Sequence, residues 1–216
     1  MKGDIMAISR LRMGTDGKGV TTLVAFFDCQ LHCKYCLNER CHKGFQGVTL
    51  RASYTPEELV KVLKKDEIYY RMSGGGVTFS GGEPLLQSAF IHEVCRLADK
   101  SWKKRIETSL NVPWKLVELL IKEIDEWIID IKDMDREIYK KYTGKKIDAL
   151  GENLFLLKNS VNPSKLHIRV PRIPYFNNEE NVAASVEWIR KYLNVEPEVF
   201  DYILPGTKTK DCCRLM

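Results

Sequence analysis

Long hydrophobic runs are missing from this sequence, which excludes a membrane-spanning helix. Its apolar stretches, such as Leu23–Phe27 and Trp127–Ile131, are far shorter than the ~20 residues that a helix needs to cross a bilayer. Proline and glycine are scarce, at 22 of 216 residues, so the chain is neither collagen-like nor disordered. Residues 1–19 have mixed composition with scattered charges, unlike a signal peptide or a transit segment. We therefore expect a globular protein of the cytosol without a membrane partner.

A dense run of one charge is also missing. The net charge is +5, from 34 Lys and Arg against 29 Asp and Glu, and the longest uninterrupted basic run is Lys103–Arg105. A nucleic-acid-binding protein usually carries a denser basic stripe interleaved with aromatic residues. We expect no nucleic-acid partner and an ordinary solvated surface, which is compatible with an acidic protein partner.

Cysteine is present in an odd number, seven, and its placement argues against a disulfide framework. Cys29, Cys33, Cys36 and Cys41 fall within thirteen residues, and Cys95 lies alone in a predicted helix. Cys212 and Cys213 are adjacent near the end, where we expect a flexible tail. Clustered cysteines in a cytosolic protein indicate metal or redox chemistry.

Strand-like apolar runs alternate with amphipathic segments along the chain, with no internal repeat or linker. The predicted strands are Val20–Phe27, Gly76–Ser80, Arg105–Leu110, Trp127–Lys132, Lys165–Pro171 and Val199–Pro205. Predicted helices begin near Thr55-Pro56 and cover Leu85–Lys100, Pro113–Lys122, Asp148–Asn159 and Glu179–Leu193. A closed eight-fold barrel needs about 250 residues. The sequence therefore predicts an α/β fold, a partial (β/α)6 parallel barrel open on one side, as a single domain over residues 1–216. Chemistry in such folds gathers at the carboxyl ends of the strands.

The first predicted strand runs directly into a Cys29-x3-Cys33-x2-Cys36 loop. Thiolates are soft ligands that suit iron–sulfur clusters and zinc. Three cysteines would leave one iron of a [4Fe–4S] cluster open to another ligand, because such a cluster ordinarily takes four. The alternative is a zinc site made by Cys33, Cys36, Cys41 and His42.

The second predicted strand lies in the sequence GGGVTFSGGEP, Gly74–Pro84. It is not a phosphate-binding P-loop, because no Gly-Lys-Ser/Thr follows the glycines. Glycines at a strand end let the backbone approach a ligand closely, and Glu83 could accept hydrogen bonds from an ammonium group. A tight turn into the next helix is the structural alternative.

Together, the two motifs resemble the radical S-adenosylmethionine (SAM) superfamily. Cys29-x3-Cys33-x2-Cys36 carries Tyr35 before its third cysteine, and Gly81-Gly82-Glu83-Pro84 is similar to that superfamily's GGE motif. More narrowly, the chain resembles glycyl radical enzyme activating enzymes of the pyruvate formate-lyase activating type. The stretches that carry this narrower resemblance are Asp16–Gly19, Gly74–Gln87, Asp130–Asp135, Tyr142–Gly144, Ile168–Pro171 and Asn178–Asn181.

The resemblance implies a [4Fe–4S] cluster and SAM as cofactors. Three irons would be held by Cys29, Cys33 and Cys36, and the fourth would be chelated by the amino and carboxylate groups of SAM. The methionine ammonium group would be received by Gly81, Gly82 and Glu83.

Further roles follow from the same resemblance. Tyr35 would lie near the adenine, Lys132 would meet the SAM carboxylate or ribose, and Arg169 would line the same pocket. A monovalent cation, Na⁺ or K⁺, would be bound beside the carboxylate by Glu107, Thr108 and Asp130, with the carbonyl of Ile128 as a further ligand. Oxygen ligands suit a hard cation, although a structural ion-pair network would use the same residue types.

The implied activity is reductive cleavage of SAM to methionine and a 5′-deoxyadenosyl radical. This radical would abstract a glycine Cα hydrogen from a partner glycyl radical enzyme. Reduced flavodoxin or ferredoxin would supply the electron, and we expect the protein to be a monomer.

The chain departs from the family pattern at several places. Lys18 replaces a proline and Glu107 replaces the usual aspartate, whose shorter side chain reaches less far. The histidine expected after the sixth strand is missing from Asp201–Gly206, where Tyr202 could act as a stacking partner instead. No inserted ferredoxin-like segment with two further sets of four cysteines is present, so a single cluster is expected.

Three alternative functions stay open. One is an activating protein of anaerobic ribonucleotide reductase, which shares the cysteine spacing. Another is a radical SAM enzyme that acts on a peptide or a small molecule. A non-catalytic zinc-binding module is the third, and it predicts that Cys41 and His42 matter as much as Cys33 and Cys36.

Overall fold

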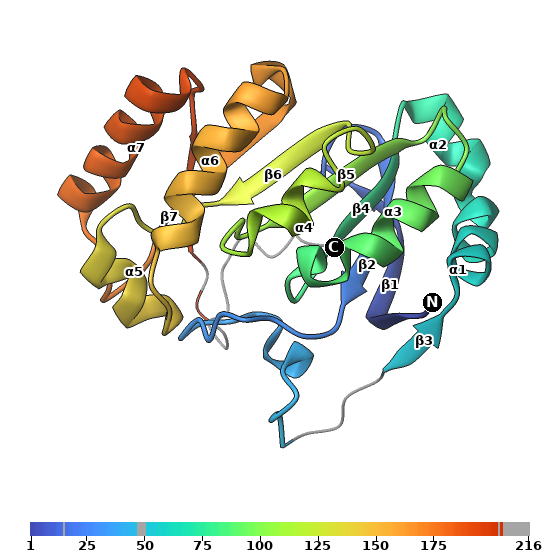
Figure 1. The fold of residues 1–216 in the computed structure, drawn as a ribbon, viewed down its shortest axis with the longest axis horizontal. Coiled ribbons are helices and arrows are strands. Elements are labelled where there is room, and N and C mark those ends of the chain that lie inside the picture. The colour runs from blue at the N-terminus through green and yellow to red at the C-terminus, as the bar shows by residue number, and fades with distance from the viewer. Residues whose placement is uncertain (15, 47–50, 203, 205–216) are drawn as a thin grey trace. The chain divides into compact units, whose positions relative to one another are not determined.

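The computed structural model of the protein describes residues 1–14, 16–46, 51–202 and 204 (Figure 1). The chain forms two units. Unit 1 contains Met1–Cys29, Asn38–Thr108 and Lys115–Glu126, and unit 2 contains Gln30–Leu37, Ser109–Trp114 and Trp127–Met216. Cys212, Cys213 and part of the predicted strand Val199–Pro205 lie outside the described residues.

Unit 1 contains five strands in the order β3-β1-β2-β4-β5. Their bounds are β1 Gly3–Met13, β2 Val20–Phe26, β3 Ala52–Tyr54, β4 Gly76–Gly81 and β5 Lys103–Thr108. β1 pairs antiparallel with β2 and β3, whereas β2, β4 and β5 are parallel. The parallel part of this sheet carries the strand ends at which the sequence places functional residues.

The first helix of unit 1 begins at a strong local signal. α1 (Pro56–Leu63) starts with a capping box, in which the Thr55 side chain accepts from the Glu58 amide and the Glu58 carboxylate accepts from the Thr55 amide. The remaining helical segments are η1 Glu39–Cys41, η2 Lys64–Asp66, α2 Glu67–Ser73, η3 Pro84–Gln87 and α3 Ser88–Leu97. α4 (Trp114–Glu118) is a short helix that begins at the last residue of a unit 2 segment.

The core of unit 1 forms between neighbouring parallel strands. Val24 of β2 lies opposite Phe79 of β4, and Phe79 lies opposite Ile106 of β5. All three side chains are buried. The Phe26 ring packs 6.1 Å from that of Phe79 and 6.2 Å from that of Phe90, centroid to centroid. Near-continuous apolar strands are expected where both sheet faces are covered.

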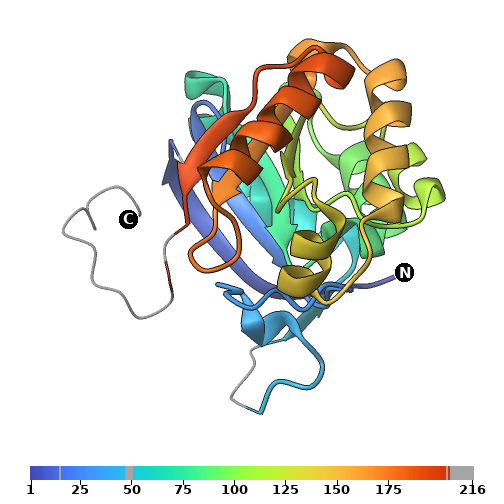
Figure 2. The ribbon, with the colours of Figure 1, turned by 90° about the vertical axis from the view of Figure 1, so that its left-hand side faces the viewer.

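Unit 2 contains three parallel strands in the order β6-β7-β8. Their bounds are β6 Glu126–Asp130, whose first residue belongs to unit 1, β7 Leu166–Arg172 and β8 Glu198–Asp201. The helical segments between them are α5 Arg136–Thr143, α6 Asp148–Ser160, η4 Pro163–Lys165 and α7 Glu179–Leu193. α6 and α7 lie side by side (Figure 2).

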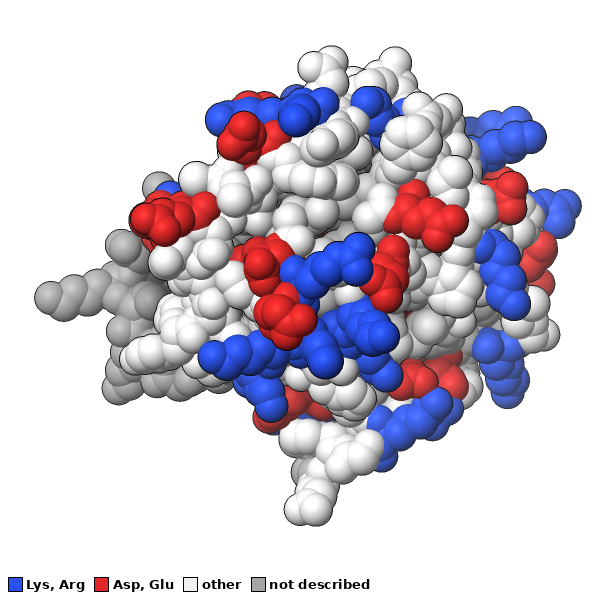
Figure 3. Space-filling view, turned by 60° about the vertical axis from the view of Figure 1, so that its left-hand side comes forward, with Lys and Arg blue, Asp and Glu red and all other residues white. Residues whose placement is uncertain are grey.

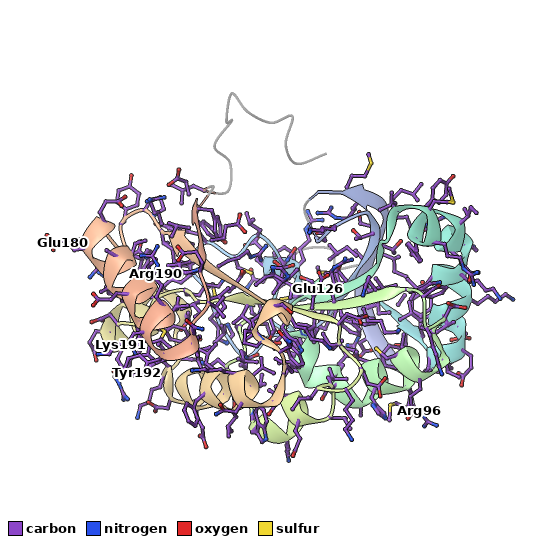
Figure 4. The ribbon with its side chains drawn as sticks, turned by 90° about the horizontal axis from the view of Figure 1, so that it is seen from above. Arg96, Glu126, Glu180, Arg190, Lys191 and Tyr192 are labelled. Carbon is purple, nitrogen blue, oxygen red and sulfur yellow. The ribbon has the colours of Figure 1, made fainter. Side chains whose placement is uncertain are left out.

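Capping residues and charged side chains stabilise the ends of two helices in unit 2. Asp135 caps α5 by accepting from the amides of Glu137 and Ile138, both at 2.9 Å, and α5 ends at Gly144 in the left-handed conformation. In α7, Glu180 lies in the first turn and Arg190 and Lys191 lie in the last (Figure 4). This arrangement complements the helix dipole.

The α/β prediction is confirmed, and all six predicted strands are present with shifted bounds. β1 and β3, which pair antiparallel, and the helix α5 were not predicted from the sequence. α4 is shorter than the predicted Pro113–Lys122. No helix in the described part of the chain has the length and apolarity that a membrane crossing requires.

Candidate active site

The glycines of the Gly81-Gly82-Glu83 segment have a structural role in unit 1. The Gly82 amide donates to the Phe26 carbonyl at 2.9 Å, and the Glu83 amide donates to the Asp28 carbonyl at 2.8 Å. Gly81 has a φ of 104°, which favours glycine, and a Cβ added to Gly82 would overlap the Asp28 carbonyl oxygen. The loop after β4 therefore packs directly on the turn that leads from β2 into Cys29.

That turn is itself unusual. Asp28 has a φ of 81° although it is not a glycine, and such backbone strain is held only by strong surroundings. Its amide donates to the Cys41 carbonyl at 2.8 Å, and its carboxylate pairs with Lys43 at 2.6 Å. The first cysteine of the motif thus follows a residue fixed from three sides: by Cys41, Lys43 and Glu83.

The Glu83 carboxylate is buried, with 1% of the residue exposed. Its Oε1 accepts from the Thr108 hydroxyl at 2.6 Å and from the Leu85 amide at 3.2 Å. In the same unit, Glu107 accepts from the Ser80 hydroxyl at 2.7 Å. The ends of β4 and β5 are therefore joined by side-chain hydrogen bonds, which bring Glu83 and Thr108 together although the sequence analysis gave them different ligands.

In unit 2, the second half of the cysteine loop lies against the end of α5. The His32 amide donates to the Thr143 carbonyl at 2.8 Å, and the Lys34 amide donates to the Tyr142 carbonyl at 3.1 Å. The Cys36 amide donates to the Cys33 carbonyl at 3.2 Å. The backbone between Cys33 and Cys36 is thus fixed by hydrogen bonds, while both thiols stay half-buried.

Three charged side chains of unit 2 form an ion-pair group. Asp130 ends β6, and its carboxylate accepts from Lys132 Nζ at 3.0 Å and from Arg169 Nε at 2.7 Å. Arg169 Nη2 lies 2.6 Å from the same carboxylate. Two cations share one anion, so the group carries a net positive charge suited to a carboxylate ligand. Arg169 lies inside β7 rather than at its end.

Burial and pairing set the charge states of this group. Burial alone would raise the pKa of Asp130, but Lys132 and Arg169 outweigh it and lower that pKa. Burial would likewise lower the pKa of Lys132, and the Asp130 carboxylate raises it instead. Burial raises the pKa of the Cys33 thiol, an effect that the charge of Lys132 opposes. Lys132 therefore favours a thiolate at Cys33, the form that binds a metal.

Tyr35 belongs to an aromatic cluster in unit 2. Its ring centroid lies 5.5 Å from Phe176, 6.1 Å from Tyr142 and 6.5 Å from Tyr202. The Tyr202 hydroxyl donates to the Tyr35 carbonyl at 2.5 Å. From the sequence, Tyr142 stands out only as part of the family resemblance and Phe176 does not stand out, since nothing in the sequence links either of them to Tyr35.

The donor set of the cysteine loop fits an iron–sulfur cluster. Cys29, Cys33 and Cys36 are half-buried, as ligands reached from solution must be, whereas Cys41 is fully buried in η1. Within the described residues, no three His, Cys, Asp or Glu side chains are already gathered as they would be around one metal ion. The roles of Glu107, Thr108 and Asp130 at a cation site stay a prediction.

Comparison with known proteins gives the family. The radical SAM superfamily matches residues 23–203. The 4-hydroxyphenylacetate decarboxylase activating enzyme of Clostridioides difficile is 41% identical over 167 residues, covering 76% of this chain and 50% of that protein. The pyruvate formate-lyase-activating enzyme of Clostridium pasteurianum is 34% identical over 182 residues, covering 84% of this chain and 74% of that protein. The (2S)-3-sulfopropanediol dehydratase activating enzyme of Klebsiella oxytoca is 38% identical over 162 residues, covering 73% of this chain and 50% of that protein.

Solved structures agree on the fold. A domain of the pyruvate-formate lyase-activating enzyme of Bacteroides vulgatus superposes with a TM-score of 0.52 at 23% identity, covering 65% of this chain and 89% of that chain. SuiB of Streptococcus suis gives a TM-score of 0.63 at 15% identity, covering 88% and 42%. These matches confirm the predicted α/β fold with an open, unclosed parallel sheet.

The chain spans about half the length of the first curated relatives that it matches. It nevertheless covers most of the pyruvate formate-lyase-activating relative at more than 30% identity. The cysteine motif, the Gly-Gly-Glu segment and nearly all of the strands lie inside the matched range. The chain belongs to the radical SAM superfamily, within the group of glycyl radical enzyme activating enzymes.

Proposed function

We propose that this protein is a SAM-dependent activating enzyme that installs a glycyl radical on a partner enzyme. The observation that carries the proposal is the half-buried Cys33–Cys36 loop in the same unit as the positively charged Asp130–Lys132–Arg169 group. The curated relatives are named for three different partner enzymes. The proposal therefore names the class of partner and not its identity.

Cys29, Cys33 and Cys36 would hold the [4Fe–4S] cluster through three thiolates. When bound, the cluster supplies the electron that cleaves SAM to methionine and a 5′-deoxyadenosyl radical, which takes a Cα hydrogen from a glycine of the partner. The protein binds and orients SAM and excludes water and oxygen from the reacting atoms. We propose reduced flavodoxin or ferredoxin as the electron source, and a monomeric protein of the cytosol with one radical SAM domain.

The chain's own residues would divide the binding of SAM between them. Lys132 and Arg169 would pair with the SAM carboxylate, since the two cations lie together on the Asp130 carboxylate. Gly81, Gly82 and Glu83 would receive the ammonium group, and Tyr35 would contact the adenine. Glu107, Thr108 and Asp130 are proposed ligands of a monovalent cation, Na⁺ or K⁺. Thr108 would also hold the Glu83 carboxylate in place, since its hydroxyl donates to Glu83 Oε1.

The test is anaerobic reconstitution with iron and sulfide, reduction, and addition of SAM. We expect methionine and 5′-deoxyadenosine from the wild type and neither product from Cys33→Ala. One tightly bound zinc per chain with no cluster would sink the proposal in favour of a zinc-binding module. A cluster that forms without cleaving SAM would also contradict it.

A further inference from the structure

Unit 2 carries five exposed lysines in a group, here called the lysine patch. Its members are Lys34, Lys140, Lys141, Lys145 and Lys146. Four of them fall within the seven residues 140–146, which contain no acidic residue. Figure 3 shows Lys and Arg side chains gathered near the middle of one face of the molecule, with Asp and Glu side chains at the border of the group. Positive charge is therefore concentrated in this segment, although the net charge of the chain is only +5.

Backbone contacts connect this patch to the cysteine loop. Lys34 lies between Cys33 and Tyr35, and its amide donates to the carbonyl of Tyr142, in the last turn of α5. Gly144, which ends α5, lies against His32, because an added Cβ would be 3.7 Å from that residue's Cβ. A protein that covers the patch would therefore also cover the loop that carries Cys33 and Cys36.

The patch lysines form no close ion pairs within the described part of the chain. No patch lysine takes part in an ion pair among those residues; Lys141 instead lies 5.8 Å above the Phe176 ring. The nearby acids are placed elsewhere: Asp135 and Glu137 lie at the opposite end of α5, and Asp148 pairs with Arg136. The patch thus presents five lysines to solvent without an ion-pair partner among the described residues.

The helix dipole explains only part of this arrangement. Cations in a last turn are favoured by about 0.3–1 kcal/mol each, which accounts for Lys140 and Lys141. Lys145 and Lys146 follow the helix, and Lys34 comes from a different segment. Bringing like charges from separate segments close together costs free energy. A binding partner of opposite charge would explain why the lysines lie together more fully than the helix dipole does.

We propose that the lysine patch docks the electron donor, an acidic one-electron carrier protein of the flavodoxin or ferredoxin class. This inference rests on the proposed function. On docking, the carrier loses one electron and the protein's cluster gains it, with no bond made or broken. Electron transfer requires a short distance between the two redox centres, and backbone contacts place the patch beside the loop that would hold the cluster.

The experiment compares two triple variants of the reconstituted protein. The patch variant is Lys140→Glu, Lys145→Glu, Lys146→Glu, which leaves Lys34 and Lys141 in place. The matched control is Lys61→Glu, Lys64→Glu, Lys65→Glu, which reverses three exposed lysines of unit 1 and changes the net charge equally. SAM cleavage is driven either by a purified acidic flavodoxin, reduced beforehand, or by dithionite, which needs no docking surface.

We expect the patch variant to lose at least about 10-fold in flavodoxin-driven rate at low salt, the lower end of the range for electrostatic steering. Its dithionite-driven rate should equal that of the wild type and of the control variant. High salt should lower the flavodoxin-driven rate of SAM cleavage by the wild type and leave that of the patch variant nearly unchanged, because salt screens the charges that steer the two proteins together. Titration of flavodoxin fluorescence with each protein should show weaker binding for the patch variant alone.

Other outcomes overturn the proposal. An equal loss of flavodoxin-driven rate in both variants would show a general charge effect. No loss in either variant would show that the patch has no part in docking the electron donor. A patch variant that accepts flavodoxin normally but fails to bind a glycyl radical enzyme would assign the patch to that partner. If dithionite drives no SAM cleavage in the wild type, the proposed function fails, and the binding titration still decides whether the patch docks flavodoxin.

Discussion

The hydroxyl of Tyr202 holds the backbone of the cysteine loop. It donates to the Tyr35 carbonyl at 2.5 Å, and the Tyr202 amide donates to Arg172 at the end of β7. The sequence suggested Tyr202 only as a stacking partner in place of the missing histidine, and that role stays a prediction. Its ring lies 6.5 Å from that of Tyr35. The hydroxyl contact could not be foreseen, because it joins residues far apart in the sequence.

Tyr202→Phe separates the two roles, because it keeps the ring and removes the hydroxyl. We expect it to lower the free energy of unfolding by about 1–2 kcal/mol, since the Tyr35 carbonyl loses its partner. The Tyr35 and Cys36 amides should exchange hydrogen faster in the protein without cluster. Urea unfolding and hydrogen exchange measure the two effects. Unchanged exchange in the loop would contradict a positioning role for the hydroxyl.

Asp66 is a buried carboxylate in unit 1 that should make stability depend on pH. It accepts from Arg10 Nε at 2.9 Å and from the Thr22 hydroxyl at 2.8 Å. The Arg10 hydrogen bond is the main cause that lowers the pKa of Asp66. The carboxylate therefore stabilises the fold above its unfolded pKa, about 3.9, and this contribution is lost as pH falls through the lower folded value.

Asp66→Asn should reduce stability at neutral pH and flatten the loss of stability in acid. The amide cannot titrate, so the free energies of wild type and variant should converge as the pH falls below about 4. Urea unfolding at a series of pH values measures this convergence. Parallel curves for the two proteins would show that Asp66 is not the titrating group.

At the scale of elements, the contact between β2 and the loop after β4 depends on the absence of a side chain at Gly82. A Cβ there would overlap the Asp28 carbonyl oxygen, and the Gly82 amide is bonded to Phe26. Gly82→Ala should therefore cost about 1–3 kcal/mol of stability, as overpacking does. Thermal unfolding with and without a bound cluster measures the cost.

Gly151→Ala is the matched control for this substitution. Gly151 lies inside α6, and a Cβ added there meets no atom within 4 Å. Alanine is the better helix former, so this change should stabilise the protein by about 0.5–1 kcal/mol. If both variants lost stability equally, the close approach at Gly82 would not be the cause.

How well the sequence predicted each element depended on how much apolar surface that element buries. β2 and β4 are buried along nearly their whole length, on both faces, and both were recognised. α5, with the sequence REIYKKYT, buries only Tyr139, Tyr142 and Thr143, and its charged residues conceal its period. β1 has alternating apolar and charged residues in its second half and pairs antiparallel, which the βα alternation did not predict.

At the scale of the whole molecule, the missed helix also concealed the lysine patch. Without α5, the lysines of residues 140–146 were counted as part of an evenly spread charge. The Cys, Gly-Gly-Glu and Asp130–Lys132 segments were found because each is contiguous in the sequence. The aromatic cluster around Tyr35 and the bond between Thr108 and Glu83 depend on the fold, and no local pattern encodes them.

Loading with iron and sulfide should stabilise the whole protein, because a ligand that binds only the folded state adds its binding free energy to folding. This is about 2.7 kcal/mol when the free ligand is 100-fold above its dissociation constant. The thermal midpoint should therefore rise on reconstitution and fall again after anaerobic treatment with a chelator.

Two variants distinguish a cluster held by the three-cysteine motif from a zinc site. Cys36→Ala should abolish the rise in the midpoint, whereas His42→Ala should retain it, because His42 lies outside the Cys29-x3-Cys33-x2-Cys36 motif. A zinc site of Cys33, Cys36, Cys41 and His42 would lose the rise in both variants, and the rise would then follow added zinc rather than iron. Since Cys41 is fully buried, we expect the iron-dependent result.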